Sequence, residues 1–303
     1  MNQKFYDELL KVLPAEQVKV QEPMKSHITF RVGGPADFFI MPKTKVELKA
    51  VISCCKEQEM PYYIIGNGSN LLVSDEGYRG VVIQIFKYMN EIVCDGNSIR
   101  AQAGALLSAV AGKALEEGLS GFEFAAGIPG TLGGACVMNA GAYGGEMKDV
   151  LKEVTVLTED GEFKKLKDYE LELGYRTSVI AKRNYIVLDA EIELHPGDKA
   201  AIKERMDELK ERRITKQPLE YPSAGSTFKR PEGYFAGKLI EDTGLRGFQV
   251  GGAQVSEKHC GFVINRENAA ASDIAELMKQ VAEKVENKFG VTLEAEVKRL
   301  GEF

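Results

Sequence analysis

Hydrophobic residues recur at helical spacing in several stretches of the chain and predict amphipathic helices. In residues 44–59, Thr44 stands at the start and Glu47 follows three residues later, which is the pattern of a capping box. Residues 272–289 begin with Ser272 as a capping residue and are followed by Gly290, a residue type that commonly ends a helix. Further helices are expected over residues 1–13, 106–117, 198–213 and 235–243.

Other stretches alternate apolar and polar residues and predict half-buried strands. In residues 184–194 every second side chain is apolar from position 186 onward. The turn Asp95-Gly96-Asn97 separates two short apolar runs and predicts a hairpin. Helices and strands follow one another in mixed order, which predicts an α+β fold. Strands, some with turns, are also expected over residues 26–41, 62–65, 81–86, 91–94, 99–103, 150–158 and 291–303.

One stretch, residues 118–145, breaks both patterns because it holds nine glycines and Glu123 as its only charge. Glycine lets the main chain approach a ligand closely, so the backbone N–H groups themselves can form a binding surface. The alternative is a buried run of turns packed between two sheets. A membrane span is disfavoured, because Pro129 and Asn139 interrupt an apolar run that would need about 20 residues.

A second loop of the same kind follows the predicted strand at residues 62–65, where the sequence reads GNGSN from Gly66 to Asn70. It is neither a dinucleotide-binding glycine motif nor a P-loop, because residues 71–73 resume an extended apolar run. Paired with the GIPGTLGG segment, it resembles the FAD-binding fold of the vanillyl-alcohol-oxidase and para-cresol-methylhydroxylase type. In that fold two such loops hold the flavin pyrophosphate between two α+β subdomains. The resemblance assigns FAD to Ile64, Ile65, Gly66, Asn67, Gly68, Ser69, Asn70, Leu71, Gly127, Ile128, Pro129, Gly130, Gly133, Gly134, Ala140 and Gly141.

Composition restricts the classes of function. The chain has 303 residues, 44% of them hydrophobic, which is enough for a sizeable core and two or three domains. Its formal net charge of −6 argues against a general nucleic-acid or anionic-membrane binder, because no basic excess is available to neutralise phosphates. Residues 1–13 lack the apolar core of a signal peptide, so a cytoplasmic protein is expected.

The cysteines and histidines give no metal or disulfide motif. The five cysteines are odd in number and show no CxxC spacing, so reduced and mostly buried thiols are expected. The histidines His27, His195 and His259 are scattered and have no motif partner. Neither a metal site nor a serine–histidine pair is therefore predicted.

Three segments outside the glycine loops contain candidate catalytic side chains. Arg176 follows an aromatic residue in the sequence LGYRTS, and Ser226 stands in the small-residue turn PSAGSTFKRP. Glu296 lies in the apolar C-terminal sequence LEAEVK. Taken singly, each has a simpler explanation: a surface ion pair for the arginine, a turn residue for the serine and a solvated strand residue for the glutamate.

Together with the two loops, these segments resemble the UDP-N-acetylenolpyruvoylglucosamine reductase family of peptidoglycan synthesis. The motifs GNGSN, GIPGTLGG, NAGAYG, GYR, AGSTFK and EV occur in the family's order, and the resemblance extends from about residue 29 to the tail. It implies that Arg176, Ser226 and Glu296 form the catalytic set. It further implies that the substrate is bound by Tyr143, Tyr175, Lys229 and Arg230.

The family resemblance also implies a reaction in two halves. NADPH gives a hydride to FAD and leaves; UDP-N-acetylglucosamine enolpyruvate then takes the hydride at its terminal vinyl carbon and is protonated at the neighbouring carbon by Ser226. Negative charge accumulates on the substrate carboxylate during hydride addition, so catalysis needs charge or hydrogen bonds aimed at it. Arg230 stands where some members have asparagine, and residues 176–205 show no insertion for a tyrosine lid loop. The chain thus resembles the shorter subtype, and a monomer is expected.

The predicted organisation has three parts. Residues 1–88, joined by the tail 291–303, and residues 89–213 form two FAD-binding subdomains, and residues 214–290 form an α+β substrate-binding domain. Two alternatives remain at this point. One is a flavin oxidase or dehydrogenase of the same fold that acts on an alcohol, and the other is a non-catalytic flavin-binding module.

Overall fold

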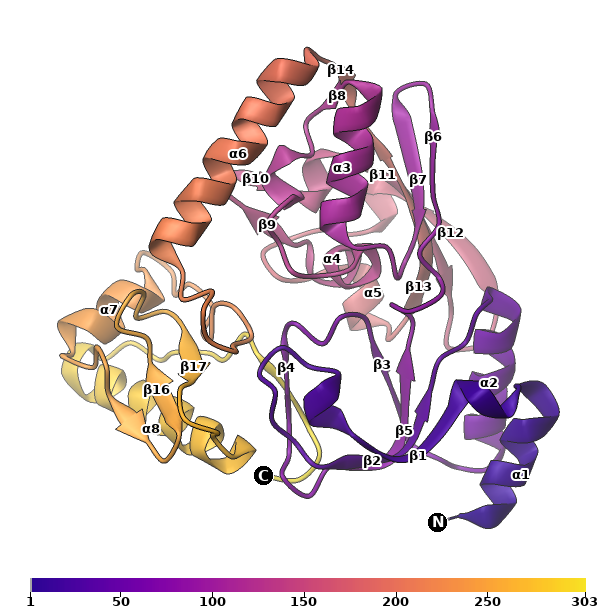
Figure 1. Cartoon of the computed structure of the whole chain (residues 1–303), viewed down its shortest axis with the longest axis horizontal. Coiled ribbons are helices and arrows are strands. Elements are labelled where there is room, and N and C mark those ends of the chain that lie inside the picture. Colours follow the sequence, from indigo (N-terminus) through magenta and orange to yellow (C-terminus); the bar gives the residue numbers. More distant parts are fainter. Residues whose placement is uncertain (1) are drawn as a thin grey trace. The chain divides into compact units, whose positions relative to one another are not determined.

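The computed structural model describes residues 2–303 and divides the chain into two compact units (Figure 1). The first unit comprises the residues up to Lys19 together with Phe39–Asn67 and Val81–Arg213. The second comprises Val20–Phe38, Gly68–Gly80 and Ile214–Phe303. Both units combine helices with sheets, which confirms the predicted α+β class.

The regular elements follow the predicted mixed order along the chain. The helices are α1 (Gln3–Val12), α2 (Lys45–Glu57), α3 (Leu107–Glu117), α4 (Leu132–Met138), α5 (Val179–Lys182), α6 (Lys199–Lys216), α7 (Ala236–Asp242) and α8 (Ala271–Phe289). The strands are β1 (Val18–Pro23), β2 (Pro35–Ile40), β3 (Tyr62–Ile65), β4 (Leu71–Val73), β5 (Tyr78–Gln84), β6 (Ile92–Asp95), β7 (Ser98–Gln102), β8 (Leu119–Ser120), β9 (Gly141–Ala142), β10 (Gly145–Glu146), β11 (Leu151–Leu157), β12 (Phe163–Lys167), β13 (Ile186–Glu193), β14 (His195–Pro196), β15 (Gln249–Val250), β16 (Ala253–Val255), β17 (Val263–Asn265) and β18 (Lys298–Leu300).

The first unit is built on a five-stranded antiparallel sheet of order β12-β11-β13-β7-β6. Ile99 on β7 lies opposite Ile192 on β13, and both are buried, whereas Arg100 lies opposite Glu191 on the other face. Helix α4 packs against β13, and α3 packs against β6 and β7. The period-two pattern of the strands therefore separates a helix-covered core face from a charged outer face.

A four-stranded sheet has the order β1-β2-β5-β3, in which β3 and β5 are parallel, with Tyr62 opposite Val81. The second unit contains the antiparallel sheet β15-β16-β17, which packs against α8, and the parallel pair β4 and β18. The strands β15 to β17 were not predicted, because runs of two or three residues are too short to show alternation.

The cap of α2 differs in one detail from the predicted capping box. Thr44 is the N-cap, and its hydroxyl accepts a hydrogen bond from the N–H of Glu47 at 3.1 Å. The carboxylate of Glu47, however, accepts from the N–H of Lys43 at 2.7 Å and from the amide of Gln17 at 2.8 Å. The helix and its N-cap are confirmed. The carboxylate of Glu47 bonds to the N–H of Lys43, one residue before the N–H of Thr44 that it would bond to in a capping box.

The predicted cap of the long C-terminal helix is wrong. Helix α8 begins at Ala271 with Ala270 as the N-cap, and Ser272 lies inside its first turn. The carboxylate of Asp75 accepts hydrogen bonds from the N–H groups of Ala271 at 2.7 Å and Ser272 at 2.9 Å. Burial alone would raise the pKa of Asp75, but these hydrogen bonds lower it overall. The predicted end at Gly290 is confirmed, with φ at 66°.

The glycine-rich stretch contains a short helix that was not predicted, α4, which begins after Thr131. The strand predicted for the tail is corrected. In the tail only Lys298–Leu300 forms a strand, whereas residues 291–297 are irregular apart from a single bridge between Ala295 and Phe228. The helix expected over residues 1–13 is α1, and Met1 lies outside the described residues.

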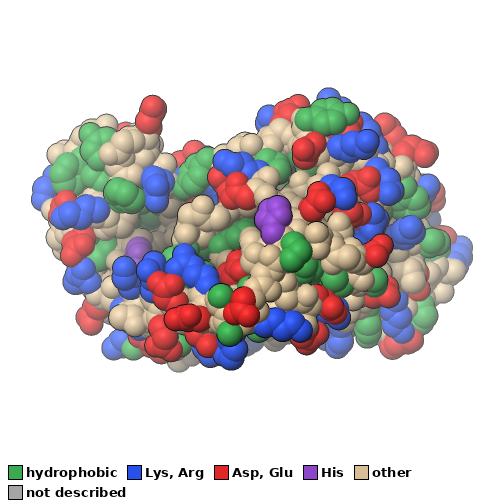
Figure 2. Space-filling view, turned by 90° about the horizontal axis from the view of Figure 1, so that it is seen from above, with side chains coloured by type: hydrophobic (Ala, Val, Ile, Leu, Met, Phe, Trp, Pro, Cys, Tyr) green, Lys and Arg blue, Asp and Glu red, His purple; other side chains and the backbone are tan. Residues whose placement is uncertain are grey.

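The surface and the thiols fit an ordinary globular chain. Figure 2 shows acidic and basic side chains interspersed over one face of the molecule. Four of the five cysteines are buried, namely Cys54, Cys55, Cys136 and Cys260, as expected. Burial raises the pKa of the Cys136 thiol to about 12, which keeps it in the unreactive protonated form. Across residues 2–303, no helix combines the length and the apolar character needed to cross a membrane.

Candidate active site

The first unit brings the two predicted cofactor loops into direct contact. The side-chain amide of Asn67 donates a hydrogen bond to the carbonyl of Pro129 at 2.8 Å. A Cβ atom placed on Gly66 would lie 2.3 Å from the hydroxyl oxygen of Thr131. Glycine at position 66 is therefore required for the loops to approach this closely.

The GIPGTLGG loop is held by backbone bonds on its other side. The carbonyl of Gly130 accepts from the N–H of Leu107 at 3.1 Å, and the N–H of Gly133 donates to the carbonyl of Ala103 at 2.8 Å. A Cβ atom on Gly133 would come within 2.8 Å of the Cβ of Ala103 and 3.0 Å of its carbonyl oxygen. Any side chain at Gly133 would push the loop away from the sheet.

Several backbone donors of these loops have no acceptor within residues 2–303. They are the N–H groups of Asn67, Gly68, Ser69 and Asn70 in the first loop, and that of Thr131 in the second. Thr131 is only 2% exposed, and buried N–H groups in proteins are almost always paired. A run of free N–H groups is a site for an anion, so the loops fit the diphosphate of FAD.

The hairpin of β9 and β10 carries three further predicted residues. The carbonyl of Ala140 accepts from the N–H of Met147 at 2.9 Å. A Cβ on Gly141 would lie 2.6 Å from the carbonyl oxygen of Gly145, so glycine is needed there for the hairpin itself. Tyr143 stands at the tip of the hairpin with φ at 53° and is 36% exposed.

Arg176 is presented by a tight turn. Gly174 and Thr177 exchange backbone hydrogen bonds of 3.1 and 3.3 Å on either side of it. Arg176 has φ at 55°, a left-handed conformation that costs free energy for a residue with a side chain. Its guanidinium carbon lies 5.3 Å from the centre of the Tyr175 ring. A strained residue held by a fixed turn is typical of functional sites.

Two buried polar residues support this turn, and the sequence analysis did not assign them a role. Asn139, which is 1% exposed, donates to the carbonyl of Gly174 at 3.1 Å and to Glu146 at 2.6 Å. The hydroxyl of Ser178 donates to the carbonyl of Val137 at 2.6 Å. An asparagine inside an otherwise apolar run was the available signal for the first of them.

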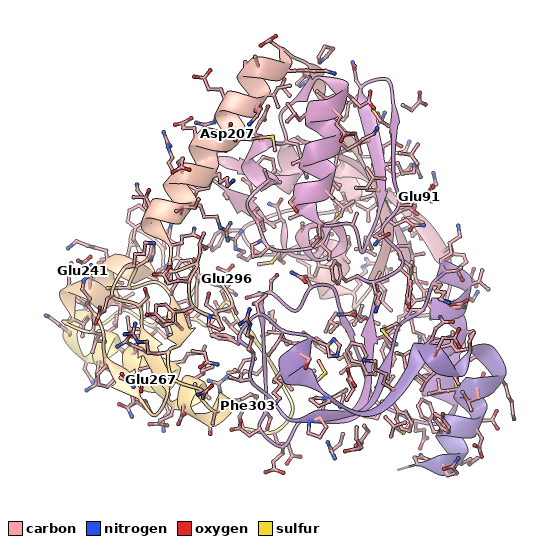
Figure 3. The ribbon with its side chains drawn as sticks, in the orientation of Figure 1. Glu91, Asp207, Glu241, Glu267, Glu296 and Phe303 are labelled. Atoms are coloured by element: carbon pink, nitrogen blue, oxygen red, sulfur yellow. The ribbon has the colours of Figure 1, made fainter. Side chains whose placement is uncertain are left out.

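The second unit brings Ser226 and Glu296 together. The N–H of Glu296 donates to the carbonyl of Thr227 at 2.9 Å, and the N–H of Lys229 donates to the carbonyl of Glu294 at 2.8 Å. These bonds join residues 227–229 to the C-terminal segment on which Figure 3 labels Glu296. Glu296 is buried, whereas the neighbouring Ser226 is exposed to solvent.

The same C-terminal segment is tied to the first cofactor loop. The side-chain amide of Asn70 donates to the carbonyl of Glu296 at 3.2 Å. The carbonyl of Asn70 accepts from the N–H of Lys298 at 3.0 Å, where β18 begins to pair with β4. The backbone of Glu296 is therefore fixed on two sides, by Asn70 and by Thr227.

The two predicted substrate cations already have neighbours in the chain. The ammonium group of Lys229 pairs with the carboxylate of Glu294. The guanidinium carbon of Arg230 lies 4.5 Å from the centre of the Phe235 ring. Arg176 and Tyr143 belong to the first unit, and Ser226, Glu296, Lys229 and Arg230 belong to the second.

The stretch between Arg176 and Arg205 contains α5, β13, β14 and the start of α6. Only short connections join these elements, and each of these residues is described. This agrees with the shorter subtype, in which no tyrosine lid loop is inserted here.

Comparison with known proteins gives matches along most of the chain. The family model for an FAD binding domain matches residues 36–167, and the model for the C-terminal domain of UDP-N-acetylenolpyruvoylglucosamine reductase matches residues 217–300. The reductase of that name from Clostridioides difficile is 57% identical over 302 residues, which cover 99% of both chains.

Solved structures give the same result. The crystal structure of the reductase from Thermus caldophilus matches with a TM-score of 0.78 at 37% identity and covers 94% of this chain and 98% of its own. A 4-ethylphenol oxidase from Gulosibacter chungangensis matches in fold alone, with a TM-score of 0.51 at 15% identity over 64% of this chain and 42% of its own. The predicted FAD-binding fold is thereby confirmed, and the chain belongs to the UDP-N-acetylenolpyruvoylglucosamine reductase family of FAD-dependent oxidoreductases.

Proposed function

We propose that the protein reduces the enolpyruvyl group of UDP-N-acetylglucosamine enolpyruvate to give UDP-N-acetylmuramate for peptidoglycan synthesis, with NADPH as the hydride donor. The observation that carries this proposal is the link from Asn70 of the cofactor loop to Glu296, and from Glu296 to the residue after Ser226. The two glycine loops would hold FAD, which would supply the hydride-transfer chemistry between NADPH and the vinyl carbon of the nucleotide substrate.

We assign Arg176 to the substrate carboxylate, on which negative charge develops during hydride addition. A guanidinium is always charged and presents its donors in a fixed fork that matches a carboxylate. Two backbone hydrogen bonds between Gly174 and Thr177 close the turn that carries Arg176, and they support a backbone fixed in position before the substrate arrives. Such preorganisation favours the transition state, because little reorganisation is needed when the charge appears.

Ser226 is the residue we assign as the proton donor to the carbon beside the carboxylate. Its hydroxyl is exposed, whereas Thr227 beside it is buried and bonded through its hydroxyl to the N–H of Val263 at 2.9 Å. The serine is therefore carried by a fixed backbone while its own side chain stays available. A hydroxyl can donate here because the acceptor is a strongly basic, carbanion-like carbon.

Glu296 has the third role in the proposal. A glutamate can assist a substrate carboxylate if it is protonated or if it orients another donor. Its backbone is fixed by hydrogen bonds to Asn70 and Thr227, and the residue is buried. We therefore assign it to the orientation of the substrate and of the proton donor.

We further infer a division of labour along the chain. Residues 1–88 with the tail 291–303, and residues 89–213, hold FAD, and residues 214–290 bind the nucleotide substrate. Tyr143, Tyr175, Lys229 and Arg230 contribute to that binding. The protein works as a monomer in the cytoplasm, on small molecules, and binds neither nucleic acid nor membranes.

An anaerobic two-step experiment tests the proposed function. The purified protein is expected to show a flavin spectrum that is bleached by NADPH. Addition of UDP-N-acetylglucosamine enolpyruvate should then restore the oxidised spectrum and form one UDP-N-acetylmuramate per flavin. Reduced protein that reacts rapidly with oxygen but ignores the enolpyruvyl nucleotide would point to an alcohol oxidase of the same fold and contradict the proposal.

A further inference from the structure

Arg213 is a cation in a position where an apolar residue is expected. Helix α6 buries Ile202 and Leu209, and Arg213 follows Leu209 by four residues on the same side of the helix. The adjacent Arg212 is 51% exposed at its side chain and pairs with Glu208. Two neighbouring arginines of one helix thus have different environments, and of the two only Arg212 has a carboxylate partner among residues 2–303.

The guanidinium of Arg213 packs against the second cofactor loop. A Cβ atom on Gly127 would lie 3.2 Å from Cδ and 3.4 Å from Nη1 of this arginine. Glycine at position 127 therefore leaves the room that the arginine side chain occupies. Burial lowers the pKa of Arg213, and the nearby Tyr143 offsets this only in part.

No hydrogen bond or ion pair to Arg213 occurs in the part of the chain that the structure describes. A half-buried charge without a partner is unfavourable, because it loses hydration and gains no compensating interaction. Proteins keep such a group where a ligand supplies the opposite charge. The planar fork of arginine suits phosphate oxygens in particular.

We propose that Arg213 binds the diphosphate of FAD at the GIPGTLGG loop, alongside the free N–H groups of the two loops. The glycine-rich sequence by itself suggests a diphosphate site made only of backbone N–H groups. In this proposal Arg213 on α6 adds one fixed positive charge to that site. The UDP group of the nucleotide substrate also carries a diphosphate and is a second candidate ligand for Arg213. Only this second ligand depends on the proposed function; binding of FAD does not.

The test compares Arg213→Gln with the matched control Arg212→Gln, which removes a charge from the next position of the same helix. Flavin fluorescence on dilution of each holoenzyme gives the dissociation constant for FAD, and steady-state kinetics give KM for the enolpyruvyl nucleotide. We expect Arg213→Gln to weaken FAD binding by roughly ten- to hundredfold, as for loss of a charge-assisted hydrogen bond. Arg212→Gln should retain FAD like the wild type.

Melting temperatures with and without added FAD separate a ligand contact from a structural one. Loss of a ligand contact lowers the melting temperature only in the presence of FAD, because the stabilisation by binding is reduced. Arg213→Lys keeps the charge but not the fork and should give an intermediate loss of FAD affinity. It also keeps the test decisive if Arg213→Gln fails to fold.

Each outcome has a defined meaning. Unchanged FAD binding with a KM raised roughly tenfold or more would overturn the assignment to FAD and would place the diphosphate of the nucleotide substrate at Arg213 instead. If both affinities match those of Arg212→Gln, the proposal is overturned. The same holds if the melting temperature falls equally with and without FAD. The flavin readout does not depend on the substrate, so it stands even if the enolpyruvyl nucleotide is not reduced.

Discussion

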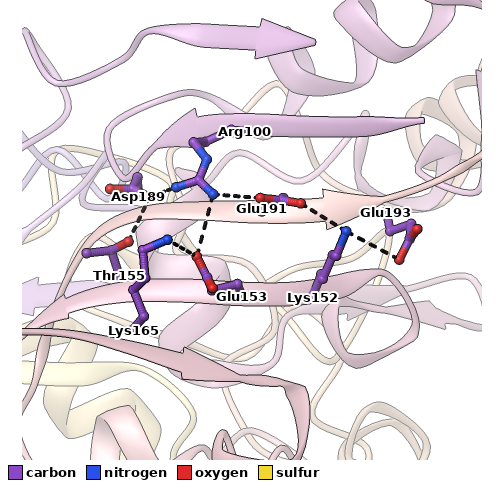
Figure 4. A network of polar contacts seen from close by, with 8 residues as sticks. All are labelled: Arg100, Lys152, Glu153, Thr155, Lys165, Asp189, Glu191 and Glu193. Carbon is purple, nitrogen blue, oxygen red and sulfur yellow. Dashed lines mark hydrogen bonds and ion pairs between the residues drawn. The ribbon is translucent and has the colours of Figure 1, made fainter. Parts of the chain in front are cut away.

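Two regions of the first unit place an arginine in opposite electrostatic environments. On the outer face of the five-stranded sheet, Arg100 lies among three carboxylates, with distances of 2.6 Å to Glu191, 3.3 Å to Asp189 and 3.5 Å to Glu153 (Figure 4). The hydrogen bond that Arg100 donates to Glu191 raises the pKa of Arg100. At the glycine loops, burial lowers the pKa of Arg213, and no carboxylate faces it within residues 2–303.

In the first region the charges are paired within the protein, whereas in the second region a ligand has to supply the missing partners. Around Arg100 every charge has a partner from the neighbouring strand, so the sheet needs nothing from outside. Around the loops a cation and several N–H groups lack partners among residues 2–303, and the glycines leave open the space that side chains would otherwise fill. Substitutions that add atoms should therefore damage the loops most, and loss of a charge should matter little on the sheet.

The largest effect is expected when a side chain is added at Gly133. Gly133→Val should abolish FAD binding, because a Cβ already meets the Cβ of Ala103 at 2.8 Å. Gly112→Val is the matched control, since Gly112 on α3 has nothing within 4 Å of an added Cβ. The flavin-to-protein absorbance ratio of the purified variants measures the effect. Full flavin content in Gly133→Val would show that the loop is not the cofactor site.

The next effect concerns charge at the reacting centre. Arg176→Gln should slow reoxidation by the enolpyruvyl nucleotide on the order of 10²–10³-fold, while reduction by NADPH stays near normal. Arg100→Gln is the control, because it removes the same charge from the compensated sheet. Stopped-flow absorbance resolves the two half-reactions. Equal slowing of both half-reactions in Arg176→Gln would exclude a role specific to the substrate carboxylate.

A smaller effect is expected from the support of the Arg176 turn. Asn139→Ala leaves the carbonyl of Gly174 and the N–H of Lys148 without their partner, which costs about 1–3 kcal/mol of stability. The turn should also loosen and reduce the rate of the substrate half-reaction. Urea unfolding of the holoprotein and stopped-flow reoxidation measure the two effects. Unchanged stability would mean that the turn is held by its own backbone bonds alone.

The smallest effect is expected on the sheet. Burial raises the pKa of Glu191, but hydrogen bonds from Arg100 and Lys152 outweigh this and lower it overall. A lowered pKa stabilises the fold above the carboxyl's unfolded pKa of about 4.3, and this contribution disappears as the pH falls through the lower folded value. Because Arg100 is 44% exposed, Arg100→Gln should cost at most about 1 kcal/mol at pH 7.

Urea unfolding at neutral pH and at a pH below the folded pKa of Glu191 checks this expectation. The difference between Arg100→Gln and the wild type should be present at pH 7 and absent in acid. A loss of several kcal/mol, or of flavin, would show that the sheet face is more than a self-sufficient surface, and the contrast with the loops would fail.

The sequence predicted the fold best where the determinants are local. The strand at Ile186–Glu193 follows from alternation, and the Thr44 cap follows from a side chain that bonds three residues on. The start of α8 could not be predicted this way, because its first N–H groups bond to Asp75, 196 residues away in the chain for Ala271. Short strands such as β16 carry no periodic signal at all.

The site was predicted from motifs, which locate the candidate catalytic residues but do not show which other residues hold them in place. The motifs marked Arg176, Ser226 and Glu296, and the structure shows a strained turn for the first and a joined backbone for the other two. The roles of Asn139 and Arg213 depend on which segments meet in space. A lone asparagine or an arginine on a charged helix does not reveal this in the sequence.

The claim that the protein protonates its reduced substrate from Ser226 is tested most directly by stopped-flow reoxidation of Ser226→Ala. The variant should bind FAD and be reduced by NADPH at the normal rate, because Ser226 touches neither cofactor loop in the proposal. Reoxidation by UDP-N-acetylglucosamine enolpyruvate should then fall by about 10²–10⁴-fold, with partial recovery in Ser226→Cys, whose thiol is a stronger acid. Reoxidation of Ser226→Ala near the wild-type rate would remove the serine from the mechanism.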